Sequence, residues 1–156
     1  MKIPYAKFIK VMCFVLGVLS ISFAQAEQGT ATFGDVKWVK APAALPPGAK
    51  LATLRGDVIK PGALMFRLKL PAGYQLKPQS SPALESLIVI SGTFNLGLGE
   101  KFDKSRTVAL SEGFKHWLDE SPYFGWTTEE TVIQIEGAGP WTVSYVNPGD
   151  DPRKRK

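Results

Sequence analysis

The stretch between Gly73 and Gly92 spaces three polar side chains in a way that could build a site. Gln79 and Ser81 are separated by one residue, and Glu85 follows Ser81 after three more. If the fold brings them together, they offer an amide, a hydroxyl and a carboxylate to one place. The carboxylate could bind a metal ion or exchange a proton, whereas the amide and the hydroxyl could orient a small molecule by hydrogen bonds.

Outside this stretch the sequence offers few groups for catalysis. It has one histidine, His116, and one cysteine, Cys13, and it has no Gly-x-Ser-x-Gly elbow. His116 is either a displaced metal ligand or general base, or else a partly exposed strand residue; we favour the strand residue because no partner for a proton shuttle can be identified. The glycines on either side of Leu98 lack the rest of a dinucleotide fingerprint. Hydrolysis by a catalytic triad and nucleotide binding are therefore not indicated.

From Val36 onward the pattern is typical of an all-β domain. Short apolar or alternating runs are separated by Gly and Pro turns, and no helical period is sustained. Between Leu64 and Leu70 the apolar side chains alternate with basic ones, as in a half-buried strand. The run Leu87 to Ile90 is apolar on both faces, which favours a place inside a sheet. The predicted strands are Val36–Lys40, Leu51–Gly56, Leu64–Leu70, Glu85–Ser91, Thr93–Leu98, Thr107–Leu110, Phe114–Leu118, Thr131–Glu136 and Trp141–Val146.

The spacing from Gly73 to Gly92 resembles the first motif of the cupin superfamily, in which histidines stand at the positions of Gln79 and Ser81. The resemblance extends from Trp38 to Pro152, and the chain is similar to small secreted cupins that consist of one sugar-isomerase-like jelly roll. The second cupin motif is also recognisable, and Tyr123 stands where the last histidine ligand is expected. The resemblance implies an all-β, cupin-like double-stranded β-helix, that is, a jelly-roll barrel.

The resemblance also implies where a metal would bind, and this sequence keeps only Glu85 of the four ligand positions. Gln79 and Ser81 are poor ligands for transition metals, and Tyr123 binds them only when it is deprotonated. We therefore expect no tightly held metal and no cofactor, with Glu85 as a weak candidate ligand. A buried Glu85 would need donors, which Gln79, Ser81 and Tyr123 could supply. These residues form either a satisfied structural network or a site that faces a cavity.

Several aromatic residues lie in segments that line or close the barrel in cupins, among them Trp117 and Trp126. Aromatic faces with a few polar groups are typical of small-molecule sites, although packing in the core is the more frequent use of such residues. The candidate ligand-binding residues are Gln79, Ser81, Glu85, Tyr123, Trp117 and Trp126.

The domain organisation begins with a predicted signal peptide over residues 1–26. Lysines at its start precede an apolar run, and Ala24-Gln25-Ala26 forms a cleavage site. A flexible lead-in of residues 27–35, the cupin-like barrel domain of residues 36–150 and a basic, solvated tail of residues 151–156 follow. This organisation predicts export to the bacterial periplasm or secretion. No membrane span is expected after cleavage, because the apolar run is too short and no second one follows.

Charge argues against nucleic-acid binding. The chain has 19 basic and 14 acidic residues, but the basic excess lies in the signal peptide and in the last four residues. A nucleic-acid-binding protein would spread basic residues over one face of its fold. The sequence thus predicts an exported cupin-like protein that lacks the usual histidine ligands and either binds a small molecule in its barrel or is structural. The alternatives are a metal-dependent cupin enzyme of dioxygenase, isomerase or lyase type with an atypical site around Glu85, and an interaction module that forms a homodimer.

Overall fold

The computed structural model describes residues 36–154. The predicted signal peptide and lead-in segment, residues 1–35, therefore lie outside the described residues, as do Arg155 and Lys156. Within the described range no helix has the length and hydropathy needed to cross a bilayer. Regular structure there consists of β-strands and three short 3₁₀ helices, which are η1 (Lys104–Arg106), η2 (Pro148–Asp150) and η3 (Pro152–Lys154).

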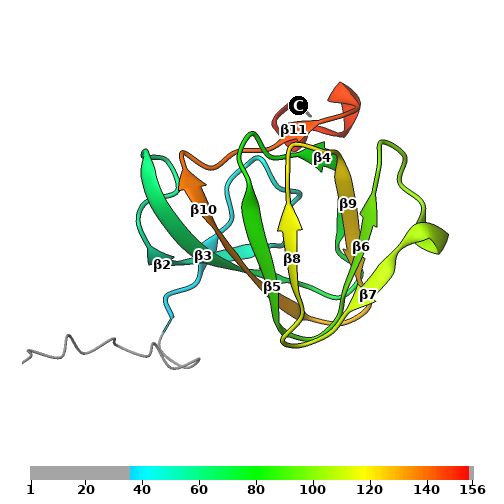
Figure 1. The fold of residues 1–156 in the computed structure, drawn as a ribbon, viewed down its shortest axis with the longest axis horizontal. Helices are drawn as coiled ribbons and strands as arrows, with labels where there is room; N and C mark the ends of the chain where they lie inside the picture. Colours follow the sequence, from blue (N-terminus) through cyan, green and yellow to red (C-terminus); the bar gives the residue numbers. More distant parts are fainter. Residues whose placement is uncertain (1–35, 155–156) are drawn as a thin grey trace, which may run out of the picture. The chain divides into compact units, whose positions relative to one another are not determined.

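The strands form two antiparallel sheets that face each other (Figure 1). The first sheet has six strands, in the spatial order β1 (Val39–Lys40), β2 (Lys50–Arg55), β3 (Gly62–Leu70), β10 (Thr131–Gly139), β5 (Glu85–Ser91) and β8 (Lys115–Leu118). The second sheet has five, in the order β11 (Ser144–Tyr145), β4 (Gln75–Ser80), β9 (Tyr123–Thr127), β6 (Phe94–Leu98) and β7 (Val108–Leu110). This arrangement confirms the predicted all-β jelly roll.

The core lies between the two sheets and contains alternate residues of the longer strands. In β3, Phe66, Leu68 and Leu70 are buried, as their two-residue spacing predicts. Strand β5 has neighbours on both sides, because β10 and β8 pair with it. Its inward residues Leu87 and Val89 are buried, whereas Ile88 and Ile90, which point the other way, are only partly covered. The apolar run therefore lies inside the sheet, as expected, with one face in the core.

Two glycines let aromatic rings approach the second sheet closely. A Cβ at Gly125 of β9 would overlap the ring of Phe94, and a Cβ at Gly97 of β6 would overlap the ring of Phe124. Phe94 belongs to the core between the sheets, whereas Phe124 contacts Phe102, with ring centroids 5.4 Å apart. The small residues of the second sheet thus allow an aromatic side chain to pack on each of its faces.

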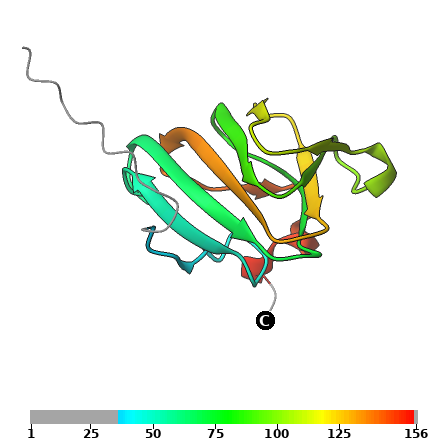
Figure 2. The same ribbon diagram turned by 90° about the horizontal axis from the view of Figure 1, so that it is seen from below.

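The sequence analysis missed two strands, β4 and β9, which pair with each other. Strand β4 contains Pro78 and polar residues, and its register with β9 shifts between Leu76 and Gln79. Such a bulge breaks the two-residue alternation by which strands are recognised. Figure 2 shows the whole ribbon of Figure 1 from below. The omission matters because these two strands carry two of the predicted site residues.

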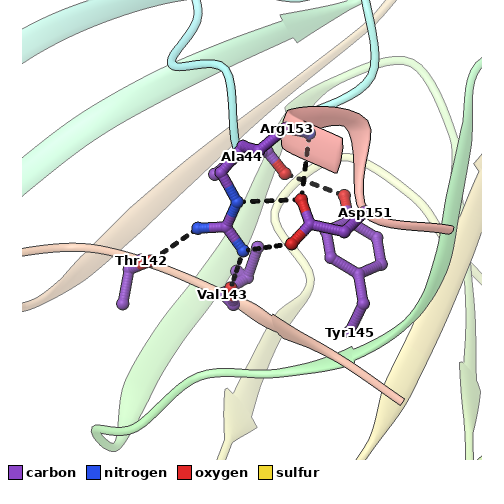
Figure 3. A network of polar contacts seen from close by, with 6 residues as sticks. All are labelled: Ala44, Thr142, Val143, Tyr145, Asp151 and Arg153. Atoms are coloured by element: carbon purple, nitrogen blue, oxygen red, sulfur yellow. Dashed lines mark hydrogen bonds and ion pairs between the residues drawn. The ribbon is translucent and has the colours of Figure 1, made fainter. Parts of the chain in front are cut away.

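In the predicted basic tail Arg153 and Lys154 are exposed, but residue 151 is not solvated. Asp151 is buried, and the Arg153 guanidinium donates to its carboxylate from Nε at 2.8 Å and from Nη2 at 2.9 Å (Figure 3). Nη2 also donates to the carbonyl of Val143 at 3.0 Å. Nearby, the Tyr145 hydroxyl donates to the carbonyl of Ala44 at 2.8 Å. Arg153 thus links Asp151 to the barrel through the carbonyl of Val143.

Candidate functional site

Four of the predicted site residues meet inside the barrel, between the ends of the strands. Gln79 is in β4, Glu85 begins β5, Tyr123 begins β9, and Ser81 lies in the connection between β4 and β5. Each of the four is at most 4% exposed. We call Gln79, Ser81, Glu85 and Tyr123 the polar cluster.

Strand pairing explains how the polar cluster forms. Gln79 and Tyr123 are partners in the register of β4 and β9, so their side chains lie on the same face of the sheet. The Gln79 amide nitrogen lies 3.4 Å from the Tyr123 hydroxyl oxygen, to which it donates a long hydrogen bond. Across the barrel the Ser81 hydroxyl donates to the Glu85 carboxyl at 2.7 Å.

The hydrogen bonds do not satisfy every polar atom near the polar cluster. The carbonyl oxygen of the Gln79 side chain is buried and accepts no hydrogen bond. The indole N–H of Trp141 is also buried and makes no hydrogen bond of ordinary geometry. Most buried polar groups in proteins have a partner, so the open acceptor of Gln79 calls for an explanation.

Trp141 reaches this region from the segment that follows β10. Its backbone N–H donates to the carbonyl of Val58 at 2.8 Å, and its ring meets Phe66 edge to face with centroids 5.1 Å apart. The indole N–H lies close enough to the Glu85 carboxyl to lower its pKa. From the sequence, Trp141 is expected among the aromatic residues that line or close the barrel, but no contact with Glu85 is predicted for it.

Burial determines the protonation of the two acidic groups in the polar cluster. Desolvation raises the pKa of Glu85, and the hydrogen bond from Ser81 and the nearby Trp141 indole offset only part of that rise. Desolvation also raises the pKa of the Tyr123 phenol, and the charge of Glu85 adds to the effect. The interior therefore favours the uncharged form of both groups.

A transition metal does not fit this set of donors. Glu85 is the one strong ligand in the polar cluster, and the raised pKa of Tyr123 opposes the phenolate that a metal would require. The amide of Gln79 and the hydroxyl of Ser81 are weak ligands for such metals. Across residues 36–154, moreover, no group of three or more His, Cys, Asp or Glu side chains could hold a metal ion.

A pocket of about 260 Å³ opens beside the polar cluster, between the ends of β6 and β8 and the start of β9. Tyr123 belongs both to the pocket wall and to the polar cluster. We call this space the mouth pocket. His116 of β8 also lines it, half-buried, so the structure places the histidine outside the polar cluster.

The two predicted tryptophans lie apart from the polar cluster. Trp117 is 58% exposed at the rim of the mouth pocket, with the Lys115 ammonium 4.8 Å from its ring centroid. Trp126 is three residues from Tyr123 in β9 and so lies on the opposite face of the sheet. There its indole N–H donates to the Thr107 hydroxyl at 3.3 Å, and the Lys104 ammonium lies 4.4 Å from the ring centroid.

Comparison with known proteins shows a shared fold at low sequence identity. The polyketide cyclase RemF from Streptomyces resistomycificus has a TM-score of 0.59 and 18% identity, over 76% of this chain and 84% of that one. An RmlC-like cupin from Shewanella frigidimarina has a TM-score of 0.52 and 9% identity, over 69% and 87%. A salicylate 1,2-dioxygenase variant from Pseudoaminobacter salicylatoxidans has a TM-score of 0.51 and 16% identity, over 64% and 29%. The sequence matches no family model, and no curated protein matches it.

Proposed function

Since this chain folds as a cupin, we propose that it binds a small uncharged molecule in the interior of its barrel without the help of a transition metal. The observation that carries the proposal is the buried carbonyl oxygen of Gln79, which has no hydrogen-bond donor within the polar cluster. Leaving such a group unpaired costs about 1–3 kcal/mol. A ligand that donates to this oxygen would recover that free energy on binding.

The location of the polar cluster also favours a ligand over a purely structural role. Tyr123 holds the Gln79 amide on one side and lines the mouth pocket on the other. A molecule that entered the mouth pocket would therefore meet the phenol first and the amide behind it. Small-molecule sites commonly combine an apolar wall with a few converging polar groups, and this region has both.

Two features of the interior favour an uncharged ligand. Burial raises the pKa of Glu85, which means that these surroundings disfavour a charge. No lysine or arginine belongs to the polar cluster, so an anionic ligand would find no partner of opposite charge there. A neutral molecule with hydrogen-bonding groups avoids the cost of burying an ion.

The metal-dependent enzyme that the sequence analysis kept as an alternative has less support. It needs a ligand set around Glu85, and the residues that surround this carboxyl are a hydroxyl, an amide, a phenol and an indole. We propose that binding takes place outside the cytoplasm, as the signal-like residues 1–26 indicate.

The test is a screen of small uncharged compounds by ligand-observed NMR, followed by calorimetric titration of the hits. Tyr123→Phe removes the phenolic oxygen that links the mouth pocket to Gln79, and we expect it to weaken binding of the hits about tenfold, the effect of about one lost hydrogen bond. Tyr74→Phe is the matched control, because Tyr74 precedes β4, away from Gln79, and its hydroxyl donates to the carbonyl of Pro46.

Hits that weaken in Tyr123→Phe and keep their affinity in Tyr74→Phe support the proposal. If the screen finds no binder, or if the hits bind Tyr123→Phe as well as the wild type, the polar cluster is a structural network and the proposal is wrong.

A further inference from the structure

Three lysines stand in a row across the first strands of the first sheet. Lys40 of β1 is the strand partner of Lys50 of β2, and Lys50 is the partner of Lys69 of β3. Partners in an antiparallel ladder point to the same face of the sheet. Their neighbours along β2 and β3, Leu51 and Leu68, are buried in the core, so the lysines point outward. We call Lys40, Lys50 and Lys69 the lysine row.

The lysine row does not help the fold by itself. Like charges on directly opposite residues of neighbouring strands destabilise a sheet. The Glu130 carboxylate lies 3.5 Å from the Lys69 ammonium and compensates that charge in part. Lys40 and Lys50 are exposed, and neither forms an ion pair with any residue in the range 36–154. Positive charge that is gathered on one face and left uncompensated suits an anionic partner.

A groove begins at the lysine row. Its first part is a pocket of about 350 Å³ lined by Trp38, Lys40 and Lys50 together with the residues just before β2. An adjoining pocket of about 340 Å³ shares three lining residues with the first, Lys40 among them, and extends to Pro152. A third pocket, also of about 340 Å³, shares three lining residues with the second and reaches Lys77 of β4. We call these adjoining pockets the basic groove.

Charge and shape together indicate what the basic groove would hold. Among the lining residues that the structure describes, three are lysines and one is acidic: Lys40, Lys50, Lys77 and Asp150. The elongated form of the groove suits an extended chain rather than a compact molecule. Neighbouring strands lie about 4.8 Å apart, and the sugar residues of an extended polysaccharide follow one another at a similar distance. Carboxylates on successive sugars would therefore meet successive lysines of the lysine row.

Trp38 favours an acidic sugar over an acidic peptide. It lies two residues before Lys40, and its ring centroid is 4.9 Å from the Lys69 ammonium, so it stands beside the lysine row. The side chain is half-buried and lines the basic groove. The indole offers a flat apolar face on which one face of a pyranose ring can pack. The polar edge of the sugar then remains free for the lysines.

We propose that the lysine row and Trp38 bind an acidic polysaccharide, with a carboxylate on each successive sugar, along the basic groove. Nucleic acid fits less well, because a nucleic-acid-binding protein spreads basic residues widely over its fold and this row occupies one edge of one sheet. The site lies on the outer face of the barrel and does not depend on the polar cluster in the interior.

The test is calorimetric titration of the purified protein with oligogalacturonate, in which every sugar carries a carboxylate, and with its carboxyl-reduced, uncharged form of the same length. We expect the acidic chain to bind at least about tenfold more tightly. Its affinity should fall as salt is added, because salt screens exposed charges. Oligothymidylate and oligoglutamate of similar charge are titrated for comparison, and both should bind more weakly than oligogalacturonate.

Substitutions at the lysine row have matched controls at the opposite edge of the same sheet. Lys50→Gln and Trp38→Ala should each weaken binding of oligogalacturonate about threefold or more. Lys115→Gln and Trp117→Ala are the controls, because these residues form a similar pair on β8, with the Lys115 ammonium 4.8 Å from the Trp117 ring centroid. Lys50→Gln should also keep or raise the melting temperature, because it removes a like charge from the centre of the row.

Binding of the acidic chain that weakens in Lys50→Gln and Trp38→Ala, and not in the two controls, supports the proposal. Equal binding of the acidic and the reduced chain, tighter binding of oligothymidylate or oligoglutamate, or equal losses in the control variants would overturn it. Tyr123→Phe should bind oligogalacturonate like the wild type, so failure at the basic groove can be distinguished from failure of the proposed function.

Discussion

Two buried carboxyl groups of this protein, Glu85 and Asp151, have opposite surroundings. Asp151 accepts from the Nε and Nη2 atoms of Arg153 and from the backbone N–H of the same residue, and these hydrogen bonds lower its pKa. Glu85 has no cation beside it and accepts one hydrogen bond, from Ser81, and burial raises its pKa. The two pKa shifts are opposite because desolvation in the interior dominates at Glu85, whereas the hydrogen bond from Arg153 dominates at Asp151.

The difference separates a structural contact from a candidate site. Around Asp151 a guanidinium also reaches the carbonyl of Val143 and completes a local network (Figure 3). Near Glu85 the side-chain carbonyl oxygen of Gln79 remains without a hydrogen-bond partner. Polar groups that serve only the fold are usually paired, so unpaired ones beside a pocket are the better indication of a ligand.

The largest expected effect comes from turning the polar cluster into a metal site. Replacing Gln79→His, Ser81→His and Tyr123→His together surrounds Glu85 with imidazoles, which suit zinc and other transition metals. We expect zinc affinity to rise at least about 100-fold over the wild type, as measured by competition with a chelating dye. A triple variant that binds zinc no better than the wild type would show that these positions do not converge as described.

A smaller effect, on thermal stability, is expected at Asp151. Arg153→Met leaves the Asp151 carboxylate without its cation, and we expect the melting temperature at neutral pH to fall by several degrees. Lys154→Met is the comparison, because the exposed Lys154 acts on Asp151 through its charge alone and its loss should lower the melting temperature less. Equal melting of both variants would mean that the contact shown in Figure 3 adds nothing to stability.

The smallest effect is expected for Glu85→Gln. The substitution removes a group that is unfavourable when charged and keeps its hydrogen-bonding capacity, so stability at pH 7 should change by less than about 1 kcal/mol or increase. A loss of several kcal/mol in a denaturant melt would contradict this interpretation.

The dependence on pH should differ in sign between the two carboxyls. The pKa of Glu85 is raised above its ordinary 4.5, so the native state holds its proton more tightly and stability from this group falls as pH rises through the raised pKa. Glu85→Gln should therefore gain stability relative to the wild type as pH increases above 4.5. The pKa of Asp151 is lowered below 3.8, so its contribution is lost only as pH falls through the lowered pKa.

The sequence predicted the central strands well and the site only in part. Strands β3, β5 and β10 have clear apolar patterns, and they lie where the sequence placed them. Strands β4 and β9 were missed because a bulge and Pro78 interrupt their alternation, although the spacing typical of cupins still identified Gln79 and Tyr123.

Tertiary contacts account for what the sequence could not predict. Trp126 was a candidate by residue type. It is three residues from Tyr123 in β9, however, and alternation along the strand puts it on the outer face. The contact of Arg153 with Asp151 and Val143 depends on the path of the chain after β11, which no local pattern specifies. For the same reason the approach of Trp141 to Glu85 became visible only in the folded chain.

The most direct test of the central claim is protein-observed NMR with ¹³C-labelled tyrosine rings, recorded in EDTA while an uncharged fragment is added. We predict that the signals of Tyr123 shift with fragment concentration, while those of Tyr74, whose hydroxyl donates to the carbonyl of Pro46, stay in place. Tyr123 signals that do not move, or that move only when EDTA is left out, would contradict a metal-free ligand site in the polar cluster.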